Sequence, residues 1–169
     1  MENIAIFFGS NGEVTEEVAN KIGQALGGNI DIIDISDATK EDFTKYDKII
    51  LGTSTWGDGD LQDDWDDFWT TFQEIDFSKM NIALFGVGDQ EGYPDTFVGA
   101  MGTIYKQVVK NGATIIGNGW SKEGYEFDES TALVEDTFVG LAIDEENQEE
   151  LTDERITKWI EIIKPSFVK

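Results

Sequence analysis

Five apolar segments of the chain have the length and composition of buried β-strands. They are rich in Ile, Leu, Val and Phe and do not alternate strictly with polar residues, which is typical of parallel strands covered on both faces. The segments span residues 3–8, 30–35, 48–52, 81–87 and 113–119. The pattern therefore predicts a sheet that is buried on both faces.

Amphipathic helical patterns lie between these segments, with apolar residues recurring every three or four positions. The patterns span residues 15–26, 63–75, 93–110 and 156–163. Asn111 and Gly112 predict the C-terminal cap of the third helix, and Pro165 is expected to end the last one. Because strands and helices alternate, the sequence predicts a doubly wound α/β fold with helices on both faces of the sheet.

One segment interrupts this alternation. Residues 120–137 (WSKEGYEFDESTALVEDT) have no clean period, and the apolar run FVGLAID resumes at residue 138. We interpret residues 120–137 as an excursion from the last strand. The chain has no internal repeat and no low-complexity linker, so residues 1–169 are expected to form a single domain.

Two residue types are missing from the chain, and their absence excludes several mechanisms. Without Cys there is no disulfide, thiolate nucleophile or Cys-ligated iron–sulfur cluster. Without His there is no Ser-His-Asp triad and no imidazole metal site. The remaining chemistry would come from carboxylate, Lys, Tyr or Ser side chains, or from a bound cofactor.

The chain is strongly acidic, with 12 Lys and Arg residues, 35 Asp and Glu residues and a formal net charge of −23. This charge repels nucleic acids and anionic lipids, and it either serves solubility alone or attracts basic partner surfaces. No segment approaches the ~18 consecutive apolar residues of a membrane span. The N-terminal sequence MENIAIFFG lacks the basic leader of a signal peptide. We therefore expect a cytoplasmic protein that binds neither nucleic acids nor membranes.

Glycine-containing segments follow three of the predicted strands. They are GSNGEVT (9–15), TSTWGDGD (53–60) and GVGDQEGY (86–93). In open parallel sheets, ligands bind beyond the carboxyl ends of the strands, where these segments are expected to lie. Two of the segments carry an aromatic residue, Trp56 and Tyr93, and two such side chains on separate loops could enclose a flat ring system.

Common nucleotide and metal motifs do not fit these segments. A Walker phosphate loop needs Gly-Lys where the sequence has Val14 and Thr15, and the dinucleotide-binding glycine pattern does not fit either. A calcium loop starting at Asp58 would need a bidentate Glu where Trp69 stands. We therefore expect no metal site, and we interpret the acidic residues that follow Asp58 as a solvated helix face.

The three segments, in this order, resemble those of flavodoxins. The most diagnostic stretch is LFGVGDQEGYPDTF (84–97), and TWGDGDLQDDWDDF (55–68) resembles the loop before the family's acidic helix. The stretches GWSKEGYEFDESTAL, FVGLAIDEENQ and LTDERITKW resemble the long-chain branch, whose last strand is interrupted by an excursion. The resemblance covers nearly the whole chain. It implies a five-stranded parallel sheet in the order 2-1-3-4-5 and one non-covalently bound FMN.

The resemblance also implies which residues hold FMN. The phosphate would bind at the start of the first helix, to Ser10, Asn11, Gly12, Glu13, Val14 and Thr15. Trp56 and Tyr93 would stack on opposite faces of the isoalloxazine ring. The rim of the ring would meet Thr55, Gly57, Asp58 and Gly59, and its pyrimidine edge would meet Gly88 and Asp89. No catalytic residue is implied.

Acidic residues near the implied ring would affect its reduction. Fully reduced FMN is an anion, so carboxylates such as Asp58, Asp60 and Asp89 should disfavour it. For one electron, about 1.4 kcal/mol corresponds to roughly 59 mV, so a field of a few kcal/mol lowers the second potential by on the order of 100–200 mV. In this family, the peptide that corresponds to Gly57 flips during one-electron reduction, and glycine lowers the conformational cost of that flip.

The phosphate loop departs from the family pattern Ser/Thr-x-Thr-Gly-x-Thr. Ser10 and Thr15 match it, whereas Gly12 replaces a hydroxyl residue and Glu13 replaces the glycine. Two arrangements of Glu13 are open. It either forms a capping box with Ser10, or it points into solvent while backbone N–H groups hold the phosphate. We expect phosphate affinity to be weaker than that of a standard loop.

The resemblance implies a low-potential one-electron carrier that shuttles between redox enzymes and is not itself an enzyme. Its partners would be redox proteins with basic docking surfaces, such as ferredoxin/flavodoxin-NADP reductases, pyruvate:flavodoxin oxidoreductase or nitrogenase, and the chain would act as a monomer. The alternative, supported by Gly12 and Glu13, is a flavodoxin-like interaction module with weakened FMN binding. A flavin or quinone reductase would need a substrate pocket beside the flavin, which Trp56 and Tyr93 would cover.

Overall fold

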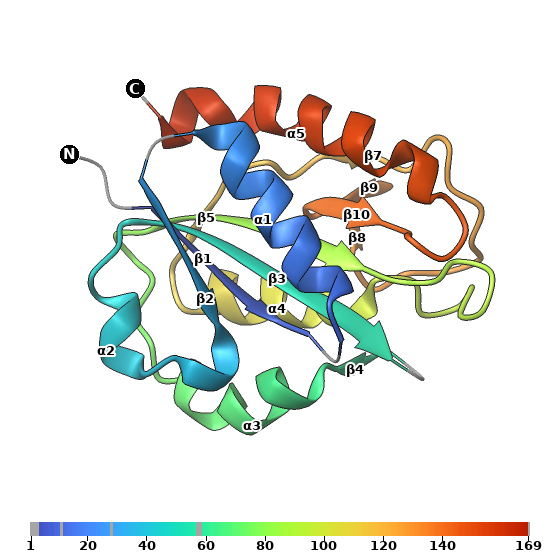
Figure 1. Ribbon diagram of the computed structural model, residues 1–169. Coiled ribbons are helices and arrows are strands. Elements are labelled where there is room, and N and C mark those ends of the chain that lie inside the picture. The colour runs from blue at the N-terminus through green and yellow to red at the C-terminus, as the bar shows by residue number, and fades with distance from the viewer. Residues whose placement is uncertain (1–3, 11, 28, 57–58, 169) are drawn as a thin grey trace.

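A parallel sheet forms the centre of the molecule (Figure 1). The computed structural model describes residues 4–10, 12–27, 29–56 and 59–168, with only the backbone described at Trp56. The sheet order is β10-β5-β3-β1-β2, and each of these strands runs parallel to its neighbours. The strands are β1 (Ile4–Gly9), β2 (Ile30–Asp34), β3 (Lys48–Trp56), β5 (Asn81–Val87) and β10 (Leu141–Ile143).

The fifth position of the sheet is occupied by two short strands. β6 (Thr114–Ile115) pairs with the start of β5, and β10 pairs with its end, at Phe85–Val87. Both run parallel to β5. The fold class and the predicted interruption of the last strand are confirmed, because the excursion leaves the sheet after β6 and returns to it at β10. The strand order differs slightly from the five-stranded prediction, because the sheet has seven strands, with β4 (Asp60–Leu61) beside β3 and β6 beside β5.

The excursion contains a small antiparallel sheet in the order β7-β9-β8. Its strands are β7 (Trp120–Ser121), β8 (Leu133–Val134) and β9 (Thr137–Phe138). Strands of two residues are too short to produce a hydrophobic period, which explains why the sequence pattern did not predict them. Ala132 and Phe138 are fully buried and join the excursion to the main core.

Helices cover both faces of the sheet (Figure 1). On one face, α1 (Val14–Leu26) and α5 (Thr152–Phe167) lie side by side. The other face carries α3 (Asp63–Phe72), α4 (Gly99–Lys110) and the short α2 (Lys40–Phe43). Single 3-10 turns occur at Ile35–Asp37 (η1) and Glu149–Leu151 (η2). No helix in the described ranges has the length and apolar character that crossing a membrane requires.

The predicted apolar stripes of the helices form the two halves of the core. Val18, Ile22 and Leu26 of α1 pack with Trp159 of α5 against one face of the sheet. The opposite face is filled by aromatic and aliphatic side chains that include Phe7, Phe43, Trp65, Phe72, Phe97, Met101 and Ile104. The role of each stripe as core packing is thereby confirmed, except at Val109 of α4, which is 44% exposed.

Three strands differ from the prediction. Of the segment predicted at residues 113–119, only Thr114–Ile115 forms a strand, β6. β3 continues beyond Gly52 to Trp56, because Thr53 and Ser54 pair with the end of β5 and Thr55 pairs with the two-residue strand β4 (Asp60–Leu61). The β-branched Thr residues favour this extended backbone. β2 lies at the edge of the sheet, and its middle residues are exposed, so burial on both faces was wrong for this strand.

The helix boundaries also differ from the prediction. α3 ends at Phe72, and α4 begins at Gly99 rather than at residue 93. α5 does not end at Pro165 but continues to Phe167. The ring of Phe167 is fully buried, and the Val168 N–H donates to the carbonyl of Lys164, so packing holds the last turn although Pro165 lacks an N–H. The predicted cap at Asn111 and Gly112 is confirmed.

Candidate functional site

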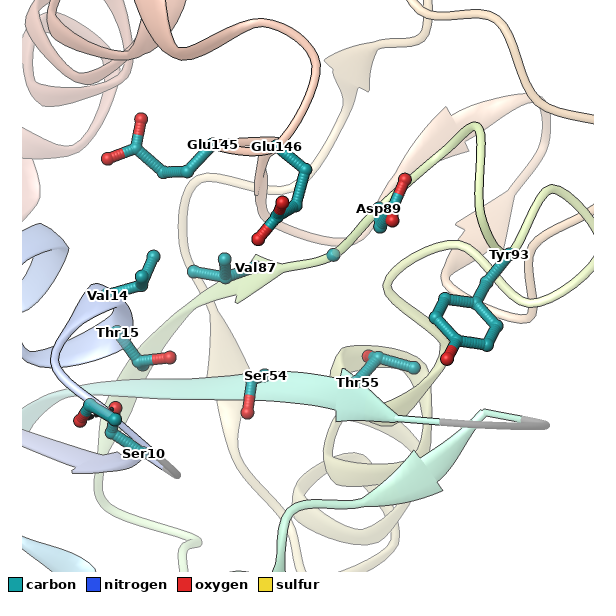
Figure 2. A pocket seen from close by; sticks show the side chains of 12 residues that line it. Ser10, Val14, Thr15, Ser54, Thr55, Val87, Asp89, Tyr93, Glu145 and Glu146 are labelled. Carbon is teal, nitrogen blue, oxygen red and sulfur yellow. Dashed lines mark hydrogen bonds between the residues drawn. The ribbon is translucent and has the colours of Figure 1, made fainter.

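A pocket opens at the carboxyl edge of the parallel sheet (Figure 2). Its empty volume, including the part that is open to solvent, is about 590 Å³. Ser10, Val14 and Thr15 lie at one end and Tyr93 at the other, with Ser54 and Thr55 between them on β3 (Figure 2). The complete lining is Ser10, Gly12, Val14, Thr15, Ser54, Thr55, Val87, Gly88, Asp89, Tyr93, Glu145 and Glu146.

The N-terminus of α1 supplies hydrogen-bond donors to one end of the pocket. The first backbone hydrogen bond of the helix runs from the Glu17 N–H to the Glu13 carbonyl at 2.9 Å. The N–H groups of Val14 and Thr15 therefore precede the helical ladder and need partners from outside the helix. Together with the positive end of the helix dipole, such groups bind anions without a Lys or Arg.

Glu13 does not form the capping box that was one of the two open arrangements. It is itself the N-cap residue of α1, its side chain makes no capping hydrogen bond, and it is exposed. The Ser10 hydroxyl donates instead to the carbonyl of Gly12 at 2.6 Å. The helix begins at Val14, so Ser10 stands too far ahead of it to be the N-cap that a capping box requires.

Thr55 connects the pocket to α4. Its hydroxyl accepts a hydrogen bond from the Ala100 N–H at 3.0 Å. That donor belongs to the first turn of α4, whose N-cap residue Val98 has a left-handed conformation and offers no side-chain cap. Thr55 thereby ties the end of β3 to the helix, and its side-chain oxygen is already engaged in the protein.

The loop after β5 closes around the carboxylate of Asp89. The N–H groups of Gly92 and Glu91 donate to Asp89 Oδ1 at 2.8 and 3.2 Å, and the side-chain amide of Asn147 donates to it at 2.8 Å. The hydrogen bond from Gly92 is the largest cause that holds the pKa of Asp89 below its ordinary value, with Asn147 and Glu91 adding to it against partial burial.

Tyr93 marks the outer end of the pocket. The residue is 40% exposed, and its N–H donates to the Asp89 carbonyl at 2.9 Å. An aromatic side chain that is held through its backbone and open on one side offers a flat apolar surface for a ring-shaped ligand.

A model of the flavodoxin family matches residues 6–159 of the chain. The chain belongs to the flavodoxin family. It is 47% identical over 161 residues to the flavodoxin of Haemophilus influenzae, and the aligned region covers 94% of this chain and 92% of that relative. It is 49% identical over 160 residues to flavodoxin 1 of Escherichia coli K12, with coverages of 94% and 90%. Its fold resembles the crystal structure of Fusobacterium nucleatum flavodoxin bound to flavin mononucleotide, with a TM-score of 0.93, 32% identity and 99% of each chain covered.

Membership in the flavodoxin family confirms the resemblance that the sequence motifs indicated, and it confirms the doubly wound fold. It also places the chain among electron-transfer carrier proteins rather than among enzymes. The flavodoxin structure from Fusobacterium nucleatum covers nearly the whole chain, so the excursion of residues 120–137 lies within the matched region.

Most of the residues expected at a flavodoxin cofactor site meet at this pocket. Eight of them line it together, namely Ser10, Gly12, Val14, Thr15, Thr55, Gly88, Asp89 and Tyr93. Glu13 and Gly59 are described but do not line it. Asn11, Gly57 and Asp58 lie outside the described residues, as does the side chain of Trp56.

The sequence prediction missed one wall of the pocket. Glu145 and Glu146 follow β10 and line the side near α5 (Figure 2). The Thr152 hydroxyl donates to Glu145 Oε2 at 2.6 Å and holds that carboxylate at the start of α5. The signal was the apolar run FVGLAID, because the carboxyl end of a further parallel strand must lie at the same edge of a flavodoxin sheet.

Proposed function

We propose that this member of the flavodoxin family binds one FMN non-covalently in the pocket and acts as a low-potential one-electron carrier between redox enzymes. The observation that carries the proposal is the pocket itself. It joins the free N–H groups of a helix N-terminus at one end to an exposed aromatic ring at the other. This arrangement fits a ligand with a phosphate at one end and a flat ring at the other.

The phosphate end suits a dianion through its backbone. Val14 and Thr15 present N–H groups, and the hydroxyl groups of Ser10 and Thr15 lie beside them (Figure 2). Gly12 has φ of +151°, a backbone conformation that glycine adopts without strain, and a Cβ atom there would meet no atom of the described residues within 4 Å. The open space at Gly12 leaves room for phosphate oxygens to approach the main chain.

The ring end suits isoalloxazine through one aromatic side chain and a fixed turn. Tyr93 would cover one face of the ring, and the partner on the other face would be Trp56. Gly88 and Asp89 would meet the pyrimidine edge. The Gly88 N–H donates to the Ile143 carbonyl at 2.9 Å, which fixes the backbone there. Thr55, Gly57, Asp58 and Gly59 complete the proposed rim.

FMN would supply the one-electron chemistry. The contribution of the chain is electrostatic, because the described lining residues include Asp89, Glu145 and Glu146 but no Lys or Arg. Carboxylates beside the ring oppose its gain of negative charge. They lower its reduction potential by roughly 59 mV for each 1.4 kcal/mol of unfavourable interaction. Solvent screening reduces the contribution of the exposed Glu146.

The acidic surface supports transfer to basic partners. A net charge of −23 attracts reductases and oxidoreductases that have basic docking surfaces, and it disfavours nucleic acids and anionic membranes. The partly exposed Tyr93 keeps the ring end of the pocket near the surface, where an electron has a short path to a docked partner. We propose a monomer of one domain, residues 1–169, that works in the cytoplasm.

The test is a titration of the flavin-free full chain with FMN and with riboflavin, followed by a redox titration of the FMN complex. FMN is expected to bind more tightly than riboflavin, and the second reduction is expected at a lower potential than that of free FMN. Equal affinities for the two flavins would show that the α1 loop does not recognise phosphate.

The alternative is an interaction module with weakened FMN binding. Glu13 supports it, because this exposed carboxylate sits at the helix end that would receive the phosphate, where the family pattern has glycine. The visible spectrum and the phosphorus content of the purified protein separate the two functions. A colourless protein without bound phosphate that still captures redox partners would favour the module.

A further inference from the structure

Two buried polar side chains stand behind the pocket without lining it. Gln90 is 2% exposed and Asp144 is fully buried. Gln90 directly follows Asp89 in the loop after β5, and Asp144 directly follows β10. Burying an amide and a carboxylate is unfavourable unless both are hydrogen-bonded, so their partners reveal what the pair holds in place.

Gln90 and Asp144 join the two loops that form the ring end of the pocket. The backbone N–H and the Nε2 of Gln90 both donate to Asp144 Oδ2, at 3.2 and 2.7 Å. Asn147 Nδ2 donates to the same oxygen at 2.8 Å and also to Asp89 Oδ1 at 2.8 Å. The N–H groups of Glu146 and Asn147 donate to Asp144 Oδ1. One carboxylate therefore accepts five hydrogen bonds from the two loops.

The other end of the Gln90 side chain reaches the excursion. Gln90 Oε1 accepts a hydrogen bond from the N–H of Glu126. The preceding residue, Tyr125, donates from its hydroxyl to the Ala142 carbonyl of β10 at 2.6 Å, and Arg155 lies 3.9 Å from the centre of its ring. The excursion is thus anchored to β10 through Tyr125 and to the pocket loop through Gln90.

These contacts fix the backbone on both sides of Asp89. On one side, the Gly88 N–H donates to the Ile143 carbonyl at 2.9 Å. On the other side, Gln90 is held to Asp144. Within the turn, the Asp89 carbonyl accepts from the Tyr93 N–H. Ile143 and Asp144, which hold the turn from outside, do not line the pocket.

We propose that Gln90 is a positioning residue: it holds the turn of residues 88–93 against the flavin ring and couples the excursion of residues 120–137 to ring binding. The proposal rests on the proposed function, since it assumes that a flavin occupies the pocket. Its consequence is that the excursion affects affinity for the flavin ring, whereas affinity for the phosphate depends on the N-terminus of α1.

Removing the Gln90 amide would loosen one buried and one partly buried hydrogen bond, those with Asp144 and Glu126. Gln90→Met preserves length and burial but leaves the Glu126 N–H without its acceptor and takes one donor from Asp144. Leaving polar groups without a hydrogen-bond partner where they are shielded from water is unfavourable. Part of that cost is relieved when the turn moves, and movement of the turn lowers affinity for the ring.

The experiment compares Gln90→Met with Gln107→Met in the full chain. Gln107 is the control, because it lies on α4, away from the pocket lining, and its side-chain amide is also hydrogen-bonded. Its Nε2 donates to Asn111 Oδ1 at 3.1 Å, and its Oε1 accepts from Gln73 Nε2 at 3.3 Å. Gln90→Met is expected to weaken riboflavin and FMN binding by the same factor, on the order of tenfold, and so to leave the ratio of the two affinities unchanged. Hydrogen exchange of the Glu126 amide is expected to accelerate by about tenfold or more in this variant alone.

Unchanged riboflavin affinity in Gln90→Met would overturn the positioning role, and so would a loss confined to FMN. If Gln90→Met does not fold, Gln90→Glu against Gln107→Glu carries the same comparison, since the new carboxylate keeps the acceptor for Glu126 but faces Asp144. Failure of the unsubstituted chain to bind either flavin would overturn the proposed function itself. Normal binding by that chain together with unchanged binding by the variant would overturn only this inference.

Discussion

The two ends of the pocket are built in different ways. The phosphate end is a short loop before α1 whose donors are backbone N–H groups. The Ser10 hydroxyl donates to the Gly12 carbonyl, so this side-chain hydrogen bond stays within the loop. The ring end depends on buried side chains, with Gln90 and Asp144 hydrogen-bonded across two loops. One end is therefore determined by helix geometry and the other by side-chain identity.

This difference explains where the chain departs from its family pattern. Gly12 and Glu13 change the phosphate loop, yet the spacing between Ser10 and Thr15 is kept, and backbone donors remain available whatever side chains the loop carries. The ring end has no such tolerance, because replacing any member of its network leaves buried polar groups unpaired. Substitutions at the two ends should therefore separate cleanly into effects on phosphate binding and effects on stability and ring binding.

The largest expected effect comes from Asp144→Ala, which removes the centre of the ring-end network. The substitution takes away the acceptor of five hydrogen bonds in a fully buried setting. We expect the free energy of unfolding to fall by about 3 kcal/mol, and riboflavin affinity to fall with it. Urea denaturation and flavin titration measure the two quantities.

Asp153→Ala is the control for this substitution. Asp153 is exposed and pairs with Lys21 at 2.9 Å, so its loss should cost at most about 1 kcal/mol. Comparable losses of stability in the two variants would contradict the view that the ring end depends on buried side chains.

The fold was largely predictable because its signals are local and repeated. The apolar stripe of α1 and the run that forms β5 match the structure within one residue. The errors fall where tertiary contacts override local signals. Phe167 is buried by packing and carries α5 past Pro165, and pairing with β5 extends β3 past Gly52.

The candidate site was predictable to the extent that it consists of loops after strands. Ser10 and Asp89 belong to such loops, whereas Thr55 lies at the end of β3, and all three meet at the pocket. Glu145 and Glu146 were missed because β10 is short and follows the irregular excursion. The role of Gln90 could not be predicted at all, since its partners Asp144 and Glu126 are distant in sequence and no local pattern brings them together.

A smaller effect is expected from Glu13→Gln, which probes the phosphate end alone. The variant removes an exposed negative charge from the N-terminus of α1 without changing its size. FMN affinity should rise by about two- to fivefold at low ionic strength, the range that corresponds to a single charge at a helix end. Riboflavin affinity should not change, and the gain should shrink at high salt.

The control is Glu74→Gln, which makes the same charge change at an exposed position after α3 that does not line the pocket. It should leave both flavin affinities unchanged. An equal gain in FMN affinity from both variants would mean that overall charge, and not the position of Glu13 at the helix end, limits phosphate binding.

The smallest effect is expected in the acid dependence of stability at Asp89. Hydrogen bonds from Gly92 and Asn147 hold the pKa of Asp89 in the folded chain below its unfolded value of about 3.9. The stabilisation is therefore fully present above that pH and is lost as the pH falls through the folded pKa, because the unfolded chain binds the proton first. Asp89→Asn keeps the acceptor oxygen but does not titrate, so its unfolding free energy should fall less steeply below about pH 4 in urea titrations.

Asp42 and Asp76, whose pKa values are also lowered by hydrogen bonds, titrate in both proteins, so the difference between the two curves isolates Asp89. Identical curves would mean that the ring-end hydrogen bonds do not distinguish the charged from the neutral carboxyl, and the contrast with the phosphate end would then rest on Gln90 and Asp144 alone.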